Sequence, residues 1–314
     1  MATVVRSFAI QGIDGYPVDI EIKMLEGQPS ISIIGLGDQA VKEAAERIQA
    51  AIDESGYVFP KKRVIISLAP SDKKKSGSHF DLAMAVGVLC QNGDIGVKKL
   101  PDYGFIGELS LDGRLRACRG ILPMIIAGQK RGIKKIIVPE ANFKEASLVH
   151  GVEILGFYDL TGVIRYLEGK TTGIETHMEE NEKILEESER ILDFKDVKGQ
   201  DELIEAVVLA AAGGHNMLMV GEPGCGKTMI AQRIPTILPE MTEEECLEVT
   251  KIYSISGLLP NGHTLMKYRP FRAPHHNASL NALIGGGANA MPGEVSLAHN
   301  GVLFLDELAE FSRR

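Results

Sequence analysis

Short apolar runs alternate with amphipathic stretches from residue 4 to about residue 168, which predicts a domain of mixed strands and helices. Residues 18–25 alternate apolar and polar side chains as a half-buried strand does, and residues 30–34 form a second strand-like run. Asp38 is a suitable N-cap for a helix whose apolar residues recur at helical spacing, and Gly56 is placed to end it.

The alternation of expected strands and helices continues to residue 150. The turn formed by Asp112 and Gly113 is a strong hairpin signal between two apolar runs. The remaining expected elements are a strand at 63–68, a helix at 79–90, the hairpin strands at 105–109 and 114–118, a helix at 121–131, a strand at 136–139 and a helix at 143–150.

Residues 107–114 (GELSLDGR), with the segments 131–135 (RGIKK) and 136–142 (IIVPEAN), resemble the proteolytic domain of Lon-type proteases. That family uses a serine nucleophile and a lysine base. The resemblance places His79 at the serine position and Leu122 at the lysine position, so we expect a Lon-like α+β domain that does not cleave peptides. Ser78 or His79 is expected to cap the helix that follows.

Two basic groups flank the expected strand at 63–68. The first is Lys61, Lys62 and Arg63, and the second is Lys73, Lys74 and Lys75. Together they could form one positive patch for a phosphodiester backbone, or they could simply be a solvated surface. The sequence leaves both interpretations open.

Residues 169–192 are polar, acidic and poor in apolar side chains, which indicates a linker with at most a short helix at 180–191. The predicted organisation is therefore a Lon-like domain at 1–168, the linker at 169–192 and a second domain at 193–314.

A phosphate-binding motif follows an apolar run at 215–220 that is expected to be a strand. The motif GxxxxGK[ST] consists of Gly221, Glu222, Pro223, Gly224, Cys225, Gly226, Lys227 and Thr228. Its glycines allow the backbone to fold around phosphate oxygens, Lys227 reaches the β and γ phosphates, and the Thr228 hydroxyl binds Mg²⁺. We interpret Cys225 as a small side chain at a variable position.

A second apolar run, at 301–307, ends in two adjacent carboxylates. Such a strand places Asp306 beside the Mg²⁺ ion and Glu307 near the water that attacks the γ phosphate. The two motifs predict an ATP- and Mg²⁺-binding parallel-sheet domain in which Lys227 and Glu307 carry catalysis.

Three further strings are similar to those of the bacterial ComM/YifB family, within the magnesium-chelatase-like AAA+ ATPases: residues 269–276, 285–287 and 292–300. Residues 194–200 resemble the segment that packs on adenine in AAA+ proteins, which makes Val197 a candidate for the base pocket. The resemblance implies a hexameric ring that uses ATP to move branched DNA during recombination. Under it, Arg269, Arg272, His275 and His276 contact DNA or a neighbouring subunit, with a purely structural role as the rival interpretation.

An AAA+ module normally continues beyond the acidic strand with a polar sensor, an arginine finger and a lid. Because the sequence stops at Arg314, we expect an incomplete P-loop AAA+ domain that hydrolyses ATP poorly. Three alternatives to a DNA motor stay open: a magnesium-chelatase-like subunit, an ATP-dependent protease and a non-catalytic binding module.

Composition limits these functions further. The 314-residue chain has 34 basic and 42 acidic residues, a formal net charge of −8, so any DNA contact must be local. The four cysteines form no CxxC pair, which favours a reducing compartment. The apolar runs fall short of the ~20 residues that a membrane helix needs. The expected location is therefore the cytoplasm.

Overall fold

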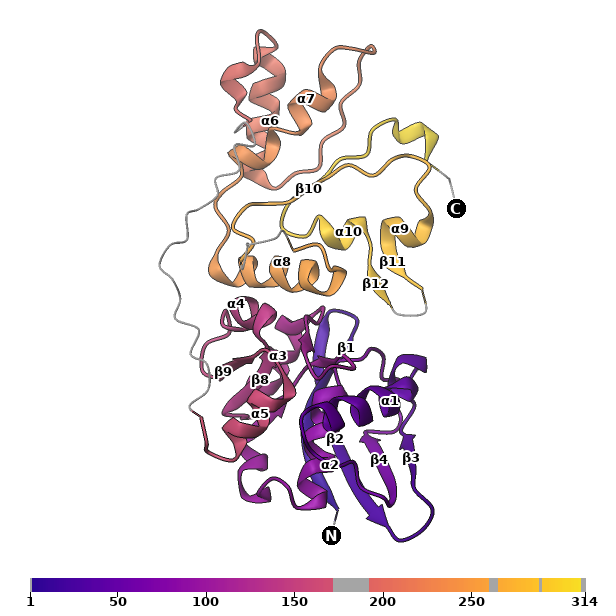
Figure 1. Cartoon of the computed structure of the whole chain (residues 1–314). Coiled ribbons are helices and arrows are strands. Elements are labelled where there is room, and N and C mark those ends of the chain that lie inside the picture. Colours follow the sequence, from indigo (N-terminus) through magenta and orange to yellow (C-terminus); the bar gives the residue numbers. More distant parts are fainter. Residues whose placement is uncertain (1, 172–191, 260–264, 288–289, 312–314) are drawn as a thin grey trace. The chain divides into compact units, whose positions relative to one another are not determined.

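The computed structural model describes residues 2–171, 192–259, 265–287 and 290–311 (Figure 1). The chain separates into two compact units: unit 1 is Met1–His177 with Ser254–Leu258, and unit 2 is Met178–Tyr253 with Leu259–Arg314. The fold is a mixed α/β fold, as the sequence predicts. Most of the expected linker, including its short helix at 180–191, lies outside the described residues.

Unit 1 is built on a seven-stranded sheet in the order β3-β4-β2-β1-β5-β8-β9. The pairs β1·β2 and β2·β4 are antiparallel and the other neighbours are parallel. The strands are β1 (Thr3–Gln11), β2 (Asp14–Leu25), β3 (Ser30–Ile34), β4 (Arg63–Ala69), β5 (Tyr103–Phe105), β8 (Lys135–Pro139) and β9 (Glu153–Phe157).

The helices of unit 1 cover both faces of this sheet. They are α1 (Gln39–Glu54), α2 (Asp81–Asn92), α3 (Ile121–Lys130), α4 (Phe143–Ala146) and α5 (Leu160–Leu167), with 3₁₀ helices at Val97–Asp102 and Glu140–Asn142. Gly87 of α2 lies against Val5, whereas Gly128 of α3 lies against Phe8. Since Val5 and Phe8 are three residues apart in β1, their side chains point to opposite faces, and the two helices therefore lie on opposite sides.

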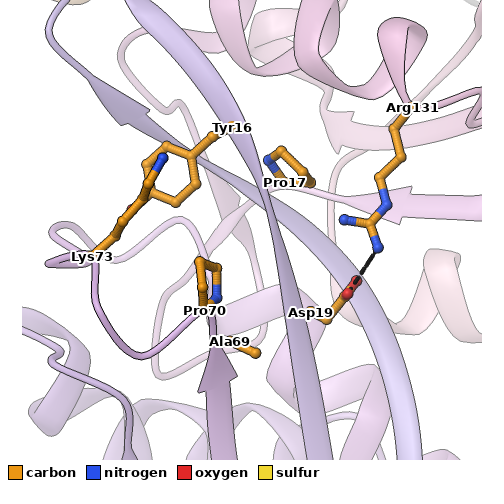
Figure 2. A pocket seen from close by; sticks show the side chains of 7 residues that line it. All are labelled: Tyr16, Pro17, Asp19, Ala69, Pro70, Lys73 and Arg131. Carbon is orange, nitrogen blue, oxygen red and sulfur yellow. Dashed lines mark hydrogen bonds and ion pairs between the residues drawn. The ribbon is translucent and has the colours of Figure 1, made fainter.

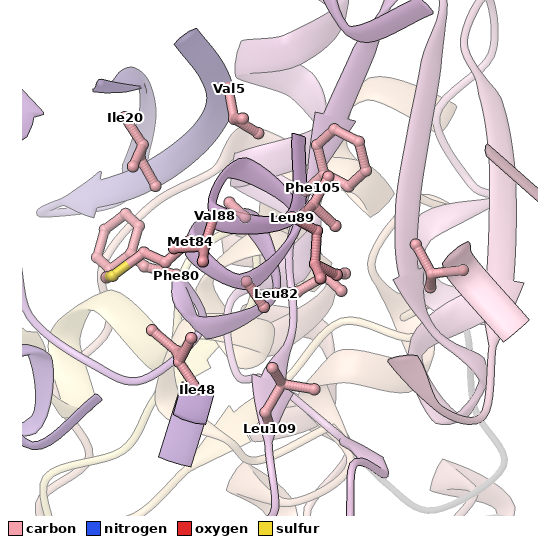
Figure 3. Packing of buried hydrophobic residues seen from close by; sticks show 14 of the residues in the cluster. Val5, Ile20, Ile48, Phe80, Leu82, Met84, Val88, Leu89, Phe105 and Leu109 are labelled. Carbon is pink, nitrogen blue, oxygen red and sulfur yellow. The ribbon is translucent and has the colours of Figure 1, made fainter. Parts of the chain in front are cut away.

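The hydrophobic core of unit 1 surrounds α2 (Figure 3). Nearly every α2 side chain is buried, including Leu82 and Met84, and these side chains pack against Ile20 from the sheet and Ile48 from α1. Each such fully buried side chain contributes about 1.5–3 kcal/mol relative to an exposed one. Asp38 caps α1 as predicted, because its carboxylate accepts a hydrogen bond of 3.0 Å from the Val41 amide.

A buried ion pair joins α1 to α2. Arg47 Nε donates to Asp81 Oδ2 at 2.7 Å, and Arg47 Nη2 donates to Asp81 Oδ1 at 3.1 Å. The Leu109 amide donates to the same carboxylate. Burial raises the pKa of Asp81 to about 6, although Arg47 opposes this shift. The predicted hairpin around Gly113 is confirmed, but its strands are short: β6 (Glu108–Leu109) and β7 (Leu115–Arg116).

The predicted cap of α2 is wrong. Phe80 occupies the N-cap position, and no side chain caps the helix. The Ser78 hydroxyl instead bonds to the Glu108 carboxylate, and His79 Nε2 bonds to the Phe8 carbonyl oxygen at 2.9 Å. Burial lowers the pKa of His79 to about 4. Leu122, at the other position expected from the Lon resemblance, is fully buried, so neither residue offers a base beside a nucleophile.

The two basic groups do not form one patch. Residues 61–63 lie at the start of β4 and residues 73–75 follow its end, and a seven-residue strand separates its ends by roughly 20 Å. Lys75 is also completely buried. A single surface formed by all six side chains is therefore excluded.

Unit 2 contributes shorter strands. β10 (Phe271–Arg272) pairs in parallel with β13 (Val302–Leu303), and β11 (Gly285–Gly286) pairs with β12 (Met291–Pro292). The helices of the C-terminal half are α6 (Asp201–Gly213), α7 (Lys227–Ala231), α8 (Glu243–Ser256), α9 (Leu280–Ile284) and α10 (Glu294–Leu297), with 3₁₀ helices at Phe194–Asp196, Ile234–Ile237 and Leu308–Glu310.

The strand expected at 215–220 is wrong. These residues belong to no strand and pair with no other strand of the described residues, and Leu218 and Val220 are 74% and 88% exposed. An apolar run becomes a strand only where a neighbour accepts its backbone hydrogen bonds. In the part of the chain that the structure describes, no helix is both long and apolar enough to cross a membrane.

Candidate nucleotide site

The glycine-rich motif forms an exposed loop that leads into α7. Gly224 and Gly226 have φ angles of +82° and +88°, in the left-handed region that glycine adopts at little cost. The φ angle of Gly226 explains why the motif fixes glycine at that position, whereas Gly224 occupies one of the variable positions of the motif. The whole loop from Gly221 to Cys225 is exposed, so a solute can reach its backbone amides.

The end of this loop meets the acidic strand end. Thr228 Oγ1 lies 3.1 Å from Asp306 Oδ2, within hydrogen-bond distance, although 78 residues separate them in the sequence. Asp306 follows β13, so the strand delivers its carboxylate to the first turn of α7. A hydroxyl and a carboxylate at this distance are two hard oxygen ligands of the kind that would hold Mg²⁺. The two predicted metal ligands are thus brought together.

Lys227 folds back over the loop. Its Nζ donates to the carbonyl oxygens of Gly221 at 2.9 Å and Glu222 at 3.0 Å. The ammonium group therefore lies on the concave side of the loop, where it can exchange these carbonyl oxygens for phosphate oxygens.

Glu307 is exposed beside Asp306 and pairs with a histidine of the string 269–276, for which the family resemblance implies contact with DNA or a neighbouring subunit. His276 Nδ1 lies 3.0 Å from Glu307 Oε2. Glu307 also has a φ angle of +52°, in the left-handed region that non-glycine residues seldom adopt. His276 thus orients the carboxylate proposed as general base. The spacing of His276 in the sequence carries no signal of this contact.

The segment expected to pack on a nucleotide base is attached to the loop. Val197 is buried with Val207 and Ile230 in an apolar cluster. Gln200 Nε2 donates to the Cys225 carbonyl oxygen at 2.9 Å. This hydrogen bond joins segment 194–200 to the loop. It could not be predicted from the sequence motifs. Cys225 itself is an exposed free thiol.

Both arginines of the string 269–276 are bound within unit 2. Arg272 makes a bidentate pair with Glu294, with distances of 2.6 and 2.7 Å. Arg269 donates to the carbonyl oxygens of Pro239 and Asn300. These contacts favour the structural role that was the rival interpretation. Among the described residues, no three histidine, cysteine or acidic side chains form a metal cluster.

Comparisons with known proteins agree with this architecture. The family model described as "Magnesium chelatase, subunit ChlI" matches residues 193–314, and that described as "Subunit ChlI of Mg-chelatase" matches residues 20–142. The uncharacterized protein YifB of Escherichia coli is 42% identical over 99% of the chain, and competence protein ComM of Haemophilus influenzae is 40% identical over 99%. The chain is homologous to the YifB and ComM proteins.

The chain spans about 60% of the length of these relatives, 60% for YifB and 61% for ComM. A Lon protease of Rhizobium meliloti is 26% identical over 149 residues, 45% of the chain and 18% of the protease. This similarity supports a Lon-like part in the chain. The limits of the predicted domains stay a prediction.

Proposed function

We propose that the chain is the nucleotide-binding part of a ComM-type AAA+ motor, which binds and hydrolyses Mg²⁺·ATP as a hexamer and moves branched DNA in the cytoplasm. Homology to YifB and ComM and the magnesium-chelatase family model support the AAA+ assignment. The observation that carries the proposal is the 3.1 Å approach of Thr228 Oγ1 to Asp306 Oδ2.

Each site residue then has a role. The loop amides and Lys227 hold the β and γ phosphates, and Thr228 and Asp306 orient Mg²⁺. Glu307, positioned by His276, accepts a proton from the attacking water. Val197 and the segment around it face the base. Mg²⁺ neutralises charge that develops on the phosphates during transfer.

A direct test is the affinity of the chain for a fluorescent ATP analogue in the presence of Mg²⁺. Lys227→Ala removes charge-assisted hydrogen bonds to two phosphates, worth about 3 kcal/mol together, so affinity should fall about 100-fold. Lys267→Ala is the matched control, because Lys267 is an exposed lysine of unit 2 outside the loop. Equal affinities of the Lys227 variant and the control would contradict the proposal.

Two alternatives are less well supported. Peptide cleavage lacks a nucleophile and base, since His79 and Leu122 hold the two Lon positions. Metal insertion by a chelatase-like subunit fits the names of the family models, but those models match residues 193–314 and 20–142 separately, whereas ComM matches 99% of the chain in one alignment. DNA-stimulated ATP hydrolysis by the longer relatives, without stimulation by a porphyrin, would favour the motor.

A further inference from the structure

An open pocket of about 380 Å³ lies on unit 1 (Figure 2). Its lining comes from the start of β2, the end of β4, the loop after β4 and the end of α3. The lining residues are Tyr16, Pro17, Asp19, Ala69, Pro70, Lys73 and Arg131. Its volume is at the lower end of the range for ligand pockets, about 300–1,000 Å³.

Lys73 is held at this pocket by an aromatic side chain. Its Nζ lies 4.6 Å from the centre of the Tyr16 ring, a cation–π distance. The Tyr16 hydroxyl donates to the Lys74 carbonyl oxygen at 3.2 Å, which ties the loop after β4 to β2. The ammonium group is thus placed over the pocket, and it forms no ion pair with any of the residues that the structure describes.

The pocket carries a net positive charge. Arg131 Nη2 lies 2.8 Å from Asp19 Oδ2, and both side chains are about one-third exposed, 35% and 31%. This pair neutralises the only acid of the lining and leaves Lys73 uncompensated. The guanidinium has further N–H groups that can bind an anion without leaving Asp19.

A second lysine, Lys75, follows Lys73 by two residues but is not among the residues that line the pocket. Lys75 Nζ is buried and has no hydrogen-bond partner among the described residues. Burial lowers the pKa of Lys75, with Asp72 opposing and Lys73 adding to the shift.

We propose that this pocket binds a phosphate group of a single-stranded DNA backbone. Lys73, from the loop after β4, and Arg131, from the end of α3, both line the pocket and supply its cationic groups, and Pro17, Ala69 and Pro70 offer apolar surface to a sugar or base. The choice of DNA over another phosphate rests on the motor function proposed above. Only the second of the two basic groups takes part, which replaces the single patch of the sequence prediction.

The test measures binding of a fluorescent oligo-dT to the chain by anisotropy, without nucleotide, as a function of salt. Each cation lost from a single-strand contact lowers the slope of log K against log salt by about 0.7 and affinity at 0.1 M salt by about fivefold. Lys73→Ala and Arg131→Gln should each show this loss. Lys61→Ala, at the other end of β4, is the matched control and should bind as the unchanged chain does.

Asp19→Asn separates binding from structure. This substitution removes the acid that competes with DNA for Arg131, so DNA affinity should rise. If the ion pair served only to stabilise the structure, Asp19→Asn and Arg131→Gln would lower DNA affinity equally. Far-UV circular dichroism verifies that each variant is folded. Equal losses in these two variants, a loss in Lys61→Ala as large as in Lys73→Ala, or no loss in Lys73→Ala would overturn the proposal.

Two further arms identify the source of the phosphate and the independence of the site. Inorganic phosphate binding that depends on Lys73, without oligo-dT binding, would overturn the DNA assignment. Lys227→Ala should leave oligo-dT affinity unchanged, and Lys73→Ala should leave binding of the ATP analogue unchanged. Failure of one site is thereby distinguished from failure of the other.

Discussion

Two apolar runs with the same strand-like pattern end in different structures. In β4 (Arg63–Ala69), β2 and β3 pair with the strand on its two sides, and Val64, Ile66 and Leu68 are buried in the core of unit 1. In the run at 215–220, Leu218 is 74% exposed, and no strand of the described residues pairs with it. Apolar sequence alone therefore does not make a strand. The hydrogen-bonding neighbour decides, and it comes from elsewhere in the chain.

The same Leu→Ala substitution made in both runs tests whether the two differ in burial. Leu68→Ala leaves a cavity in the core of unit 1 and should lower the free energy of unfolding by about 3 kcal/mol. Leu218→Ala removes an exposed side chain and should change it by less than about 0.5 kcal/mol. Urea unfolding followed by far-UV circular dichroism measures both. A loss at Leu218 as large as that at Leu68 would mean that the run at 215–220 is buried in solution.

The next effect concerns pH and compares two buried groups of unit 1. Burial raises the pKa of Asp81 from 3.8 to about 6, so between these values the folded chain binds more protons than the unfolded chain. Its contribution to the free energy of unfolding therefore falls by up to about 3 kcal/mol as pH rises through this window. Burial lowers the pKa of His79 from 6.5 to about 4, and its contribution rises with pH over nearly the same window.

The two contributions oppose each other in the unchanged chain. Asp81→Asn should therefore leave a free energy of unfolding that increases from pH 4.5 to 6.5, and His79→Gln should leave one that decreases. Urea unfolding at the two pH values measures the slopes. Identical slopes in both variants would show that these groups titrate normally in the folded chain.

The smallest effect compares ion pairs in the two units. Arg47→Met leaves the fully buried Asp81 carboxylate without its ion-pair partner and should lower the free energy of unfolding by about 2 kcal/mol. Arg272→Met breaks the Glu294 pair, whose side chains are 30% and 21% exposed, and should cost only about 1 kcal/mol. The same urea experiment measures both losses, and the reverse order would contradict the burial argument.

The fold of unit 1 was predictable where a local pattern coincides with burial. The strands at β2, β3, β4 and β8 and the helices α1, α2 and α3 lie where periodicity places them. The expected helix at 143–150 is wrong in length, since α4 ends at Ala146. The strands expected at 18–25 and 30–34 left out β1 (Thr3–Gln11), whose three successive buried residues break strict alternation.

The candidate site was predictable where chemistry fixes the spacing. Gly226 has a positive φ angle, and Thr228 and Asp306 need to reach one ion, so these three residues could be named from the two motifs. The contacts of His276 with Glu307 and of Gln200 with Cys225 carry no such constraint on spacing. They depend on how β13 and the segment 194–200 pack, and only the structure shows them.

In the proposed function, Thr228 and Asp306 together hold one Mg²⁺ ion. A double-mutant cycle on the affinity for the ATP analogue in Mg²⁺ tests it most directly, with Thr228→Ala, Asp306→Asn and the double variant. Residues that share an ion act as a unit, so the double variant should bind nearly as well as the weaker single variant, and removal of Mg²⁺ should abolish the differences. Losses that simply multiply, or that persist without Mg²⁺, would contradict the account.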